Sequence, residues 1–404
     1  MSNRPDVTKL LPVAGIRIGT TCANIKKPDR RDLVVFELAE GTATAAVFTR
    51  NQFCAAPVQV ARQHLQTTTT RYLIVNTGNA NAGTGEQGMQ DSLQTCRLLA
   101  EQAACEPEAV LPFSTGVIGE SLQMEKFIKA IPDAFGKLTE QGWQDAAYGI
   151  MTTDTVPKGL SRQLELDGKT VTVTGIAKGS GMIRPDMATM LAYVATDAGL
   201  AEELLQACLN YAVDHSFNRI TVDGDTSTND ACILMATGKS GVSIDTADST
   251  NYRQLAEVIR QVCEELAKAM IVDGEGATKL ITIDVVGGRD EAECQQVAYT
   301  VAHSPLVKTA FFASDPNWGR ILAAVGRAGI MDLDINALKI YLGEVCIVSQ
   351  GGRDAAYTEQ QGQQVMDQTE ITIRIELNRG EASTRVWTCD FSYDYVKINA
   401  EYRT

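Results

Sequence analysis

The segment Ala177–Leu191, with the sequence AKGSGMIRPDMATML, constrains the fold of this chain more than any other stretch. It combines a lysine, several small residues and a proline, and it follows neither the period of a helix nor that of a strand. A strand is predicted directly after it, over residues 191–195. The irregular segment therefore leads into a sheet, and Thr189 stands just before that sheet begins.

Thr189 is a candidate N-terminal nucleophile, released if the chain cuts itself at the Ala188–Thr189 bond. A threonine hydroxyl is a weak nucleophile unless a base lies beside it, and the residue's own freed α-amine can be that base. Such an amine has an unperturbed pKa of about 7.7 to 8.0, so it accepts a proton near neutral pH. The small Ala188 leaves the bond open to attack, and Pro185 restrains the segment before it. The local residues leave an alternative, in which Thr189 is only the first residue of the strand.

Other candidate sites lack a residue or a spacing that their chemistry requires. Gly83–Gly88 matches G-x-G-x-x-G, but Thr77–Ala82 separates it from the preceding strand, whereas a dinucleotide site needs a tight turn. Oxygen-bearing side chains alternate as in a calcium loop at Asp223, Asp225, Ser227 and Asn229. However, Thr228 occupies the position where that loop needs glycine, and Leu234 the position where it needs glutamate. None of the three histidines lies beside a Gly-x-Ser-x-Gly elbow. We therefore expect no bound cofactor and no metal.

Charge and cysteine content narrow the class of protein. With 36 basic and 50 acidic residues the formal net charge is −14, which disfavours nucleic acid and anionic membranes as partners. Ten cysteines are scattered without a Cys-x-x-Cys pair, as is typical of reduced thiols in a cytosol. Met1–Thr8 is polar and no run of about 18 apolar residues occurs, so neither a leader nor a membrane span is predicted. The expected location is cytoplasmic.

The order of the predicted elements indicates an α+β layered fold, with helices packed outside sheets. One hairpin is expected between Leu33–Leu38 and Thr42–Phe48, and another around Asp167-Gly168. The longest helix is expected over Asn251–Ile271, where apolar residues recur every three or four positions. No linker marks a boundary between independent domains. After that helix strand candidates dominate, namely Leu280–Val286, Leu338–Val348, Ile371–Leu377 and Ser383–Phe391.

Several motifs together resemble the ornithine acetyltransferase (glutamate N-acetyltransferase) family of arginine biosynthesis. The segment Lys178–Leu191 is similar to the self-cleavage signature of that family. The other similar segments occur in family order from near the N-terminus to the last residue, and are Asn76–Ala82, Ser114–Gly119, Met151–Thr155, Asp223–Asp230, Asp273–Lys279, Ser314–Arg320 and Asn399–Thr404.

The resemblance implies a role for individual residues. Thr189 would be the nucleophile, and autocatalytic cleavage between Ala188 and Thr189 would give an α chain of 1–188 and a β chain of 189–404. Thr115 and Gly116 would form the oxyanion hole. Lys178 could then hold a substrate carboxylate, and Glu275 the cationic end of ornithine. The full set of implied substrate contacts is Thr152, Lys178, Thr189, Glu275, Asn399 and Thr404.

The resemblance also implies a fold, an assembly and a reaction. The fold would be a four-layer α-β-β-α sandwich of N-terminal-nucleophile type, to which both chains contribute as one catalytic unit, and two αβ units would form a heterotetramer. The reaction would move an acetyl group from N-acetylornithine to glutamate through an acetyl-threonine intermediate. Acetyl-CoA would be a second donor only in an enzyme of the bifunctional kind. Two alternatives stay open: a self-processing aminopeptidase or amidohydrolase, and a non-catalytic binding protein with an intact chain.

Overall fold

The structure is a computed structural model that describes residues 6–184 and 190–401. These residues form two compact units. The sandwich unit comprises residues 6–184, 190–218 and 225–270, and the C-terminal unit comprises residues 219–224 and 271–401. The sandwich unit thus contains residues from both sides of the predicted cut at 188/189.

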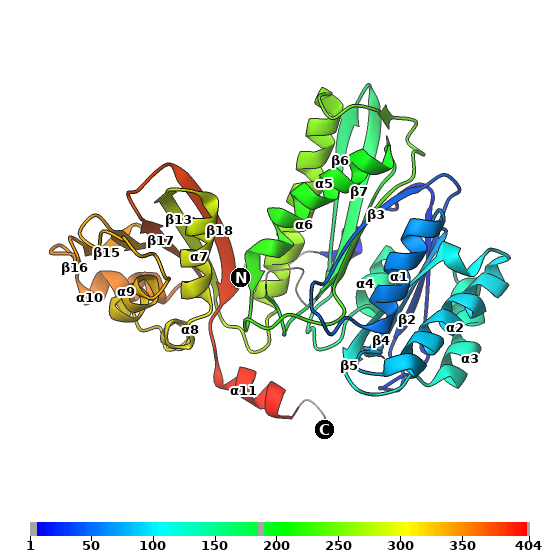
Figure 1. Ribbon diagram of the computed structural model, residues 1–404, viewed down its shortest axis with the longest axis horizontal. Helices are drawn as coiled ribbons and strands as arrows, with labels where there is room; N and C mark the ends of the chain where they lie inside the picture. Colours follow the sequence, from blue (N-terminus) through cyan, green and yellow to red (C-terminus); the bar gives the residue numbers. More distant parts are fainter. Residues whose placement is uncertain (1–5, 185–189, 402–404) are drawn as a thin grey trace. The chain divides into compact units, whose positions relative to one another are not determined.

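Two sheets form the centre of the sandwich unit (Figure 1). The first has the strand order β1-β2-β4-β5, and the second has the order β3-β11-β8-β7-β6. In the second sheet β3, β6 and β7 precede the predicted cut, whereas β8 and β11 follow it. The strands are β1 (Ile16–Thr21), β2 (Leu33–Leu38), β3 (Ala43–Phe48), β4 (Tyr72–Asn79), β5 (Val110–Val117), β6 (Lys158–Leu166), β7 (Lys169–Lys178), β8 (Leu191–Thr196) and β11 (Ala231–Ala236).

The inner faces of the two sheets share one apolar core. Tyr193 of β8 lies at its centre, with its ring centroid 5.0 Å from that of Phe36 in β2 and 5.5 Å from that of Phe113 in β5. Every residue of β8 is buried, which is why its sequence reads as a continuous apolar run rather than an alternating one. The strand predicted at 191–195 is therefore confirmed.

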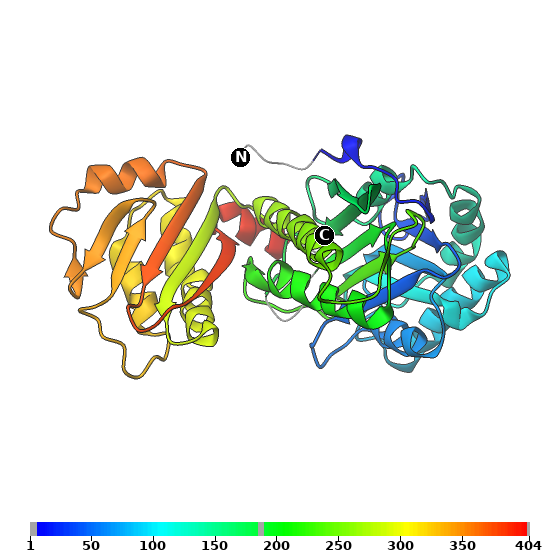
Figure 2. The same cartoon turned by 90° about the horizontal axis from the view of Figure 1, so that it is seen from above.

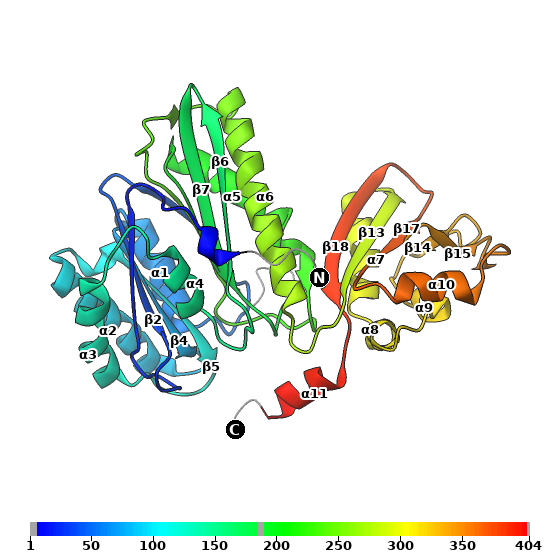
Figure 3. The same ribbon diagram turned by 180° about the vertical axis from the view of Figure 1, so that it is seen from behind.

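Helices cover the outer faces of both sheets and complete a four-layer α-β-β-α sandwich. Figure 3 shows α2 and α3 outside the first sheet, where Leu99 and Phe127 pack with Val35 and Ile74. On the second sheet the long helix α6 lies so close to β7 that a methyl group on Gly175 would come within 3.0 Å of Val262. The predicted fold class is confirmed. The helices of this unit are α1 (Ala56–Thr67), α2 (Gly85–Ala103), α3 (Met124–Gly136), α4 (Trp143–Gly149), α5 (Glu202–Asp214) and α6 (Thr250–Val272), whose last two residues belong to the C-terminal unit.

The C-terminal unit contains a seven-stranded sheet of order β10-β18-β13-β17-β14-β15-β16. Its strands from residue 280 onward, coloured yellow to red, lie side by side in Figure 2. The helices α7 to α10 share a core with one face of the sheet, represented by Ile281, Ile283 and Val285 of β13. The strands are β10 (Ile220–Thr221), β13 (Leu280–Gly288), β14 (Lys339–Leu342), β15 (Val345–Ser349), β16 (Gly352–Arg353), β17 (Glu370–Glu376) and β18 (Ala382–Cys389). The helices are α7 (Glu291–Ala302), α8 (Pro305–Phe312), α9 (Trp318–Gly326), α10 (Glu359–Met366) and α11 (Tyr393–Ala400).

Two expectations about strand pairing had different outcomes. The hairpin around Asp167-Gly168 is confirmed, because both residues have positive φ, 51° and 73°, as a two-residue turn of this kind requires. The hairpin between β2 and β3 is wrong. The chain turns at Glu40-Gly41, but β2 pairs with β1 and β4, whereas β3 pairs with β11 in the other sheet.

The expectation of mainly strands after α6 also needs correction. Five helices, α7 to α11, interrupt that region. The single strand expected over Leu338–Val348 is in fact the antiparallel pair β14 and β15, which turns at Gly343. Periodicity over short apolar runs does not distinguish one long strand from two short ones.

Short elements complete the described chain. A two-stranded sheet pairs β9 (Gly199–Leu200) with β12 (Ser243–Ile244), and the 3-10 helices are η1 (Val7–Lys9), η2 (Pro107–Ala109) and η3 (Phe217–Arg219). Across residues 6–184 and 190–401, no helix is both long enough and apolar enough to traverse a bilayer.

Candidate active site

The end of β5 carries the two residues predicted for the oxyanion hole. β5 runs parallel to β4, and Gly116 lies opposite Gly78 at their ends. Gly116 has φ of +135°, and a Cβ there would lie 2.2 Å from the carbonyl carbon of Gly78. Only glycine fits between two strand ends this close together, and the register of the pair shifts immediately afterwards, at Asn79. The Thr115 side chain is therefore held on a rigid strand end.

Lys178, at the end of β7, reaches the same point. Its ammonium nitrogen Nζ donates a hydrogen bond to Thr115 Oγ1 at 3.2 Å. Lys178 is 3% exposed and Thr115 is 6% exposed. In the antiparallel pairing of β7 with β8, Lys178 lies opposite Leu191. The structure thus brings together two predicted site residues from separate motifs, next to the first residue of β8.

Asp154 links Lys178 to the loop that carries Thr152. Its Oδ1 accepts hydrogen bonds from Lys158 Nζ at 2.7 Å and from the Gly179 N–H at 2.8 Å, and its Oδ2 accepts from the Thr152 N–H at 2.9 Å. The side chains of Asp154 and Lys158 are fully buried. Burial alone would raise the pKa of the Asp154 carboxyl, but the charges of Lys158 and Lys178 outweigh that effect and hold this pKa below its ordinary value. Asp154 is therefore a buried anion with several partners.

Asp230 is a second buried carboxyl close to the start of β8. It precedes β11, which pairs in parallel with β8, and its Oδ1 accepts the Met190 N–H at 2.9 Å. Burial raises the pKa of Asp230 well above its ordinary value, although the Met190 N–H and the charge of Lys178 act in the opposite direction. Its Oδ2 forms no hydrogen bond within the described part of the chain. Met190 directly follows the predicted nucleophile, so Asp230 fixes the backbone on that side of it.

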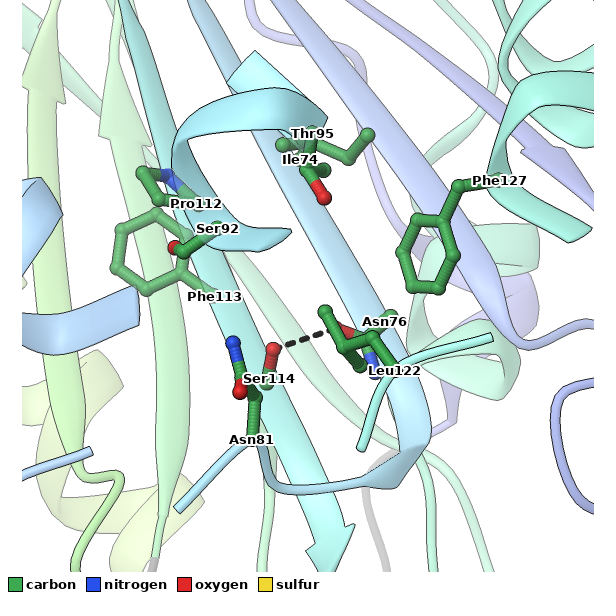
Figure 4. A pocket seen from close by; sticks show the side chains of 10 residues that line it. All are labelled: Ile74, Asn76, Asn81, Ser92, Thr95, Pro112, Phe113, Ser114, Leu122 and Phe127. Atoms are coloured by element: carbon green, nitrogen blue, oxygen red, sulfur yellow. Dashed lines mark hydrogen bonds between the residues drawn. The ribbon is translucent and has the colours of Figure 1, made fainter. Parts of the chain in front are cut away.

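Amide side chains hold the surrounding loops. Asn229 Nδ2 donates to the carbonyl oxygens of Ala80, at 2.6 Å, and of Ser114, at 3.0 Å. Ser114 Oγ in turn donates to Asn76 Oδ1 (Figure 4). These contacts join three of the motifs on which the family resemblance rests.

A small cavity lies beside this network (Figure 4). Its volume is about 10 Å³, which is room for about one water molecule. Asn76, Asn81 and Ser114 line it, together with Ser92, whose hydroxyl has no hydrogen-bond partner in the described residues. It is too small for an amino acid, so it is a packing feature behind the end of β5.

In the C-terminal unit two further predicted residues meet. Asn399 Nδ2, on α11, donates to Glu275 Oε2 at 2.9 Å. The two segments approach closely at Gly276, where φ is +70° and a Cβ would lie 2.5 Å from the backbone nitrogen of Tyr395. The hydroxyl of Tyr395 donates to Asp223 at 3.4 Å. The motif Asp273–Lys279 and helix α11, which carries Asn399, are thus neighbours within this unit.

The other predicted residues either lie outside the described residues or belong to different units. Ala188, Thr189 and Thr404 lie outside the described residues. Thr152, Lys178, Thr115 and Gly116 belong to the sandwich unit, whereas Glu275 and Asn399 belong to the C-terminal unit.

Three further residues have a clear structural role at the site: Asp154, Asn229 and Asp230. The sequence suggests Asn229 only as part of the rejected calcium loop, and it assigns no role to Asp154 or Asp230. Each lies inside a motif that was noticed, Met151–Thr155 or Asp223–Asp230. A charged or amide residue within such a motif is the available signal, but its partners are remote in sequence and only the fold reveals them.

Comparison with known proteins identifies the family. A family model described as the ArgJ family matches residues 17–404. The arginine biosynthesis bifunctional protein ArgJ of Pseudomonas fluorescens is 57% identical over 396 residues, which cover 98% of each chain. The protein of the same name from Pseudomonas syringae pv. tomato is 56% identical over the same share.

Solved structures give matches of smaller extent. A crystal structure of arginine biosynthesis bifunctional protein ArgJ from Bacillus halodurans is 36% identical, with a TM-score of 0.49, over 52% of this chain and 97% of that one. Ornithine acetyltransferase from Mycobacterium tuberculosis, solved in complex with ornithine, is 33% identical, with a TM-score of 0.38, over 44% of this chain and 94% of that one. Because the family model and the Pseudomonas relatives match almost the whole length, this chain belongs to the ArgJ family of arginine-biosynthesis enzymes.

Proposed function

We propose that this enzyme transfers an acetyl group from N-acetylornithine to glutamate, with Thr189 as the nucleophile. The observation that carries the proposal is the meeting of Thr115 with Lys178 beside the first residue of β8. Donors on a strand end, buried and held by their neighbours, are the preorganised arrangement that stabilises a tetrahedral oxyanion. The relatives named as bifunctional proteins of arginine biosynthesis, and the relative solved with ornithine, support the choice of substrates.

The first step of the proposed chemistry generates the nucleophile. The Thr189 hydroxyl attacks the Ala188 carbonyl carbon, the acyl group moves from nitrogen to oxygen, and water hydrolyses the resulting ester. An α chain of 1–188 and a β chain of 189–404 result, and the freed α-amine becomes the base for the next reaction.

The second step is a ping-pong transfer. Thr189 Oγ attacks the acetyl carbonyl of N-acetylornithine while the α-amine takes the hydroxyl proton. The amide C–N bond then breaks, and the leaving ornithine nitrogen receives that proton. The amine of glutamate next attacks the acetyl-threonine ester, which gives N-acetylglutamate and restores the hydroxyl. Thr115 and Gly116 stabilise the oxyanion in each half-reaction.

Substrate binding is assigned to the residues that the family motifs predict for it. Thr152 and Lys178 contact the shared α-carbon end, and Glu275, Asn399 and Thr404 contact the side-chain end, where the carboxylate of Glu275 suits the ornithine ammonium. Neither a metal nor a bound cofactor takes part, and acetyl-CoA enters only as an alternative donor. The ten free thiols support a reducing, cytoplasmic environment, and the mature assembly is proposed to be an α2β2 heterotetramer.

The cleavage step is tested by denaturing gel electrophoresis of the purified protein. Wild-type protein should give two fragments of similar size, and Thr189→Ala should give a single intact chain without acetyl transfer. Fully intact wild-type protein, after prolonged incubation to allow slow maturation, would contradict the mechanism.

The transfer step is tested by supplying N-acetylornithine or acetyl-CoA in turn, with and without glutamate. We expect N-acetylglutamate from the first donor, and product from acetyl-CoA identifies a bifunctional enzyme. Release of acetate faster than formation of N-acetylglutamate would instead support the self-processing amidohydrolase.

A further inference from the structure

The contact between Lys178 and Thr115 suggests a role for the lysine beyond substrate binding. The two side chains come from motifs 63 residues apart and meet in a buried place, at 3.2 Å. A lysine buried to this degree is uncommon unless its charge has partners. Thr115 is proposed to donate a hydrogen bond to the oxyanion. It therefore matters which of the two side chains is the donor in the contact with Lys178.

The direction of this hydrogen bond follows from the chemistry of the two groups. A lysine ammonium has three donors and no acceptor, so Thr115 Oγ1 must be the acceptor. The charge of Lys178 is one of the causes that lower the pKa of the Asp154 carboxyl, so the two side chains attract each other. A threonine hydroxyl has a single proton, and within the described residues no acceptor receives it from Thr115. That proton is consequently available to a ligand oxygen.

We propose that Lys178 is a positioning residue for the oxyanion hole, which orients and polarises the Thr115 hydroxyl so that its proton points to the developing oxyanion. This inference rests on the proposed function and deepens it. A hydroxyl that accepts a charge-assisted hydrogen bond becomes a stronger donor, because neighbouring hydrogen bonds polarise one another. Lys178 acts through Thr115 and makes its contribution in the transition state, when negative charge appears on the substrate oxygen.

Asp154 helps to hold Lys178 in position through the backbone of the next residue. Its carboxylate accepts the N–H of Gly179, the residue directly after Lys178, and the ion pair with Lys158 holds that carboxylate in place. The backbone at the end of β7 is therefore held in position. Asp154 also accepts the Thr152 N–H, so that one carboxylate anchors both segments.

The proposal differs in its consequences from the simpler role of Lys178 as a partner of the substrate carboxylate. A carboxylate contact is made equally in the ground state and the transition state, so its loss raises KM and is independent of Thr115. Loss of the polarisation of Thr115 instead lowers kcat, and this effect disappears once the Thr115 hydroxyl has been removed. A double-mutant cycle between the two residues separates these cases.

The experiment measures kcat and KM for acetyl transfer in the mature enzyme, for Lys178→Met, Thr115→Val and the double variant. We expect Thr115→Val to lower kcat about 10²-fold to 10³-fold. Lys178→Met should lower kcat by roughly 10-fold to 10²-fold in the wild-type background, and by less than about 3-fold in the Thr115→Val background. Additive losses in kcat would overturn the proposal, as would a large rise in KM with kcat unchanged.

Three further variants serve as controls. Thr115→Ser keeps the hydroxyl, so the penalty for Lys178→Met should persist in that background. Lys178→Arg keeps a charged donor and should recover a large part of kcat. Lys129→Met removes an exposed lysine of α3 and should change neither constant. A merely structural role for Lys178 predicts the same loss in all three Thr115 backgrounds.

Self-cleavage gives a second readout if a variant does not mature. The oxyanion formed on the Ala188 carbonyl needs the same donors, so the rate at which intact chain disappears should show the same coupling. If Lys178→Met fails to fold, Lys178→Gln keeps a donor of similar length without the charge. Wild-type chain that never cleaves would refute the proposed function, whereas wild-type cleavage with additive effects refutes only the role of Lys178.

Discussion

At the residue scale, Gly116 has room for no side chain. A methyl group there would meet backbone atoms of Gly78, which cannot move aside without separating β4 from β5. Gly119, three residues later, also has positive φ, 85°, but a Cβ there would meet nothing within 4 Å. Because both glycines have positive φ but only Gly116 lacks space, comparing an alanine substitution at each position separates the effect of a steric clash from that of backbone strain.

We predict that Gly116→Ala lowers kcat by at least about 10²-fold, because the oxyanion donors would be displaced. Gly119→Ala should cost only about 1–2 kcal/mol of stability, from the left-handed conformation, and leave kcat within a few-fold of wild type. Steady-state kinetics and thermal melts of both variants test this. Equal losses of activity in the two variants would show that the space at Gly116 is unimportant.

Asp230 provides a pH-dependent prediction. Burial raises its pKa in the folded chain, so this group stabilises the fold below the unfolded pKa of about 3.9, and that contribution is lost as pH rises towards the folded pKa. Asparagine can still accept the Met190 N–H but cannot ionise. The Tm of Asp230→Asn relative to wild type should therefore increase between pH 4 and pH 8, by roughly 2–6 °C. Differential scanning fluorimetry across that range measures it, and a flat difference would contradict the assignment.

Asp154 should give the opposite slope. Its pKa is lowered in the folded chain, so its contribution to stability is present above the unfolded pKa and is lost as pH falls. The Tm of Asp154→Asn relative to wild type should therefore decrease as pH rises from 3 to 6. The loss should be large, about 3–5 kcal/mol at neutral pH, because Lys158 is left buried without its ion-pair partner. Parallel slopes for the two aspartates would mean that burial dominates at both.

At the scale of elements, β8 depends on the aromatic contacts of Tyr193 between the sheets. Its hydroxyl is buried, with no hydrogen-bond partner among residues 6–184 and 190–401. The ring contributes apolar contact, whereas the hydroxyl carries a desolvation cost.

We predict that Tyr193→Phe raises stability by about 1 kcal/mol, since it removes the unsatisfied hydroxyl and keeps the ring. Tyr193→Ala should lower stability by about 3–5 kcal/mol, as expected when a large buried aromatic side chain is lost. Chemical denaturation of both variants provides the measurement. A loss in Tyr193→Phe comparable to that in Tyr193→Ala would show that the hydroxyl has an important partner.

The elements also show where sequence reasoning succeeds and where it stops. β8 and α6 were predicted within one or two residues, because an all-apolar run and a long amphipathic period are strong local signals. The pairing of β2 and β3 was wrong, because alternation within a strand does not identify its neighbour. The partner of β3 is β11, almost two hundred residues later, and only the packing of the complete sandwich selects it.

The same limit applies to the site. The motifs identified Thr115, Lys178, Glu275 and Asn399, and the structure joins them into two pairs, one in each unit. The sequence does not predict a role for Asp230, because that role depends on the parallel pairing of β11 with β8. A buried carboxyl near a reactive bond is recognised by its environment, which no local pattern encodes.

At the scale of the whole molecule, each unit has its own apolar core. Ile233 of β11 lies in the core between the two sheets of the sandwich unit, and Ile283 of β13 lies in the core of the C-terminal unit. The sequence shows no linker between the units, because the chain passes between them around residues 219–224 and again inside α6.

We predict that the two units unfold in separable transitions, as units with independent cores can. Ile283→Ala should lower the temperature of one calorimetric transition and Ile233→Ala that of the other, each by an amount equivalent to about 2–5 kcal/mol. Scanning calorimetry of the matched pair tests the idea. A single transition that both substitutions shift equally would show that the units unfold together.

The strand order of the second sheet has a consequence for refolding of the protein after cleavage. β8 and β11, which follow the proposed cut, lie between β3 on one side and β7 and β6 on the other, which precede it. The two pieces are thus interwoven in this sheet rather than docked, because neither contains all of its strands. In the uncut chain the strands of this sheet are covalently connected, which limits the entropic cost of bringing them together. Two separated pieces would first have to associate in solution. Cleavage at the proposed position would therefore make folding irreversible, because an enzyme that unfolded after the cut would no longer have the covalent connection between its strands.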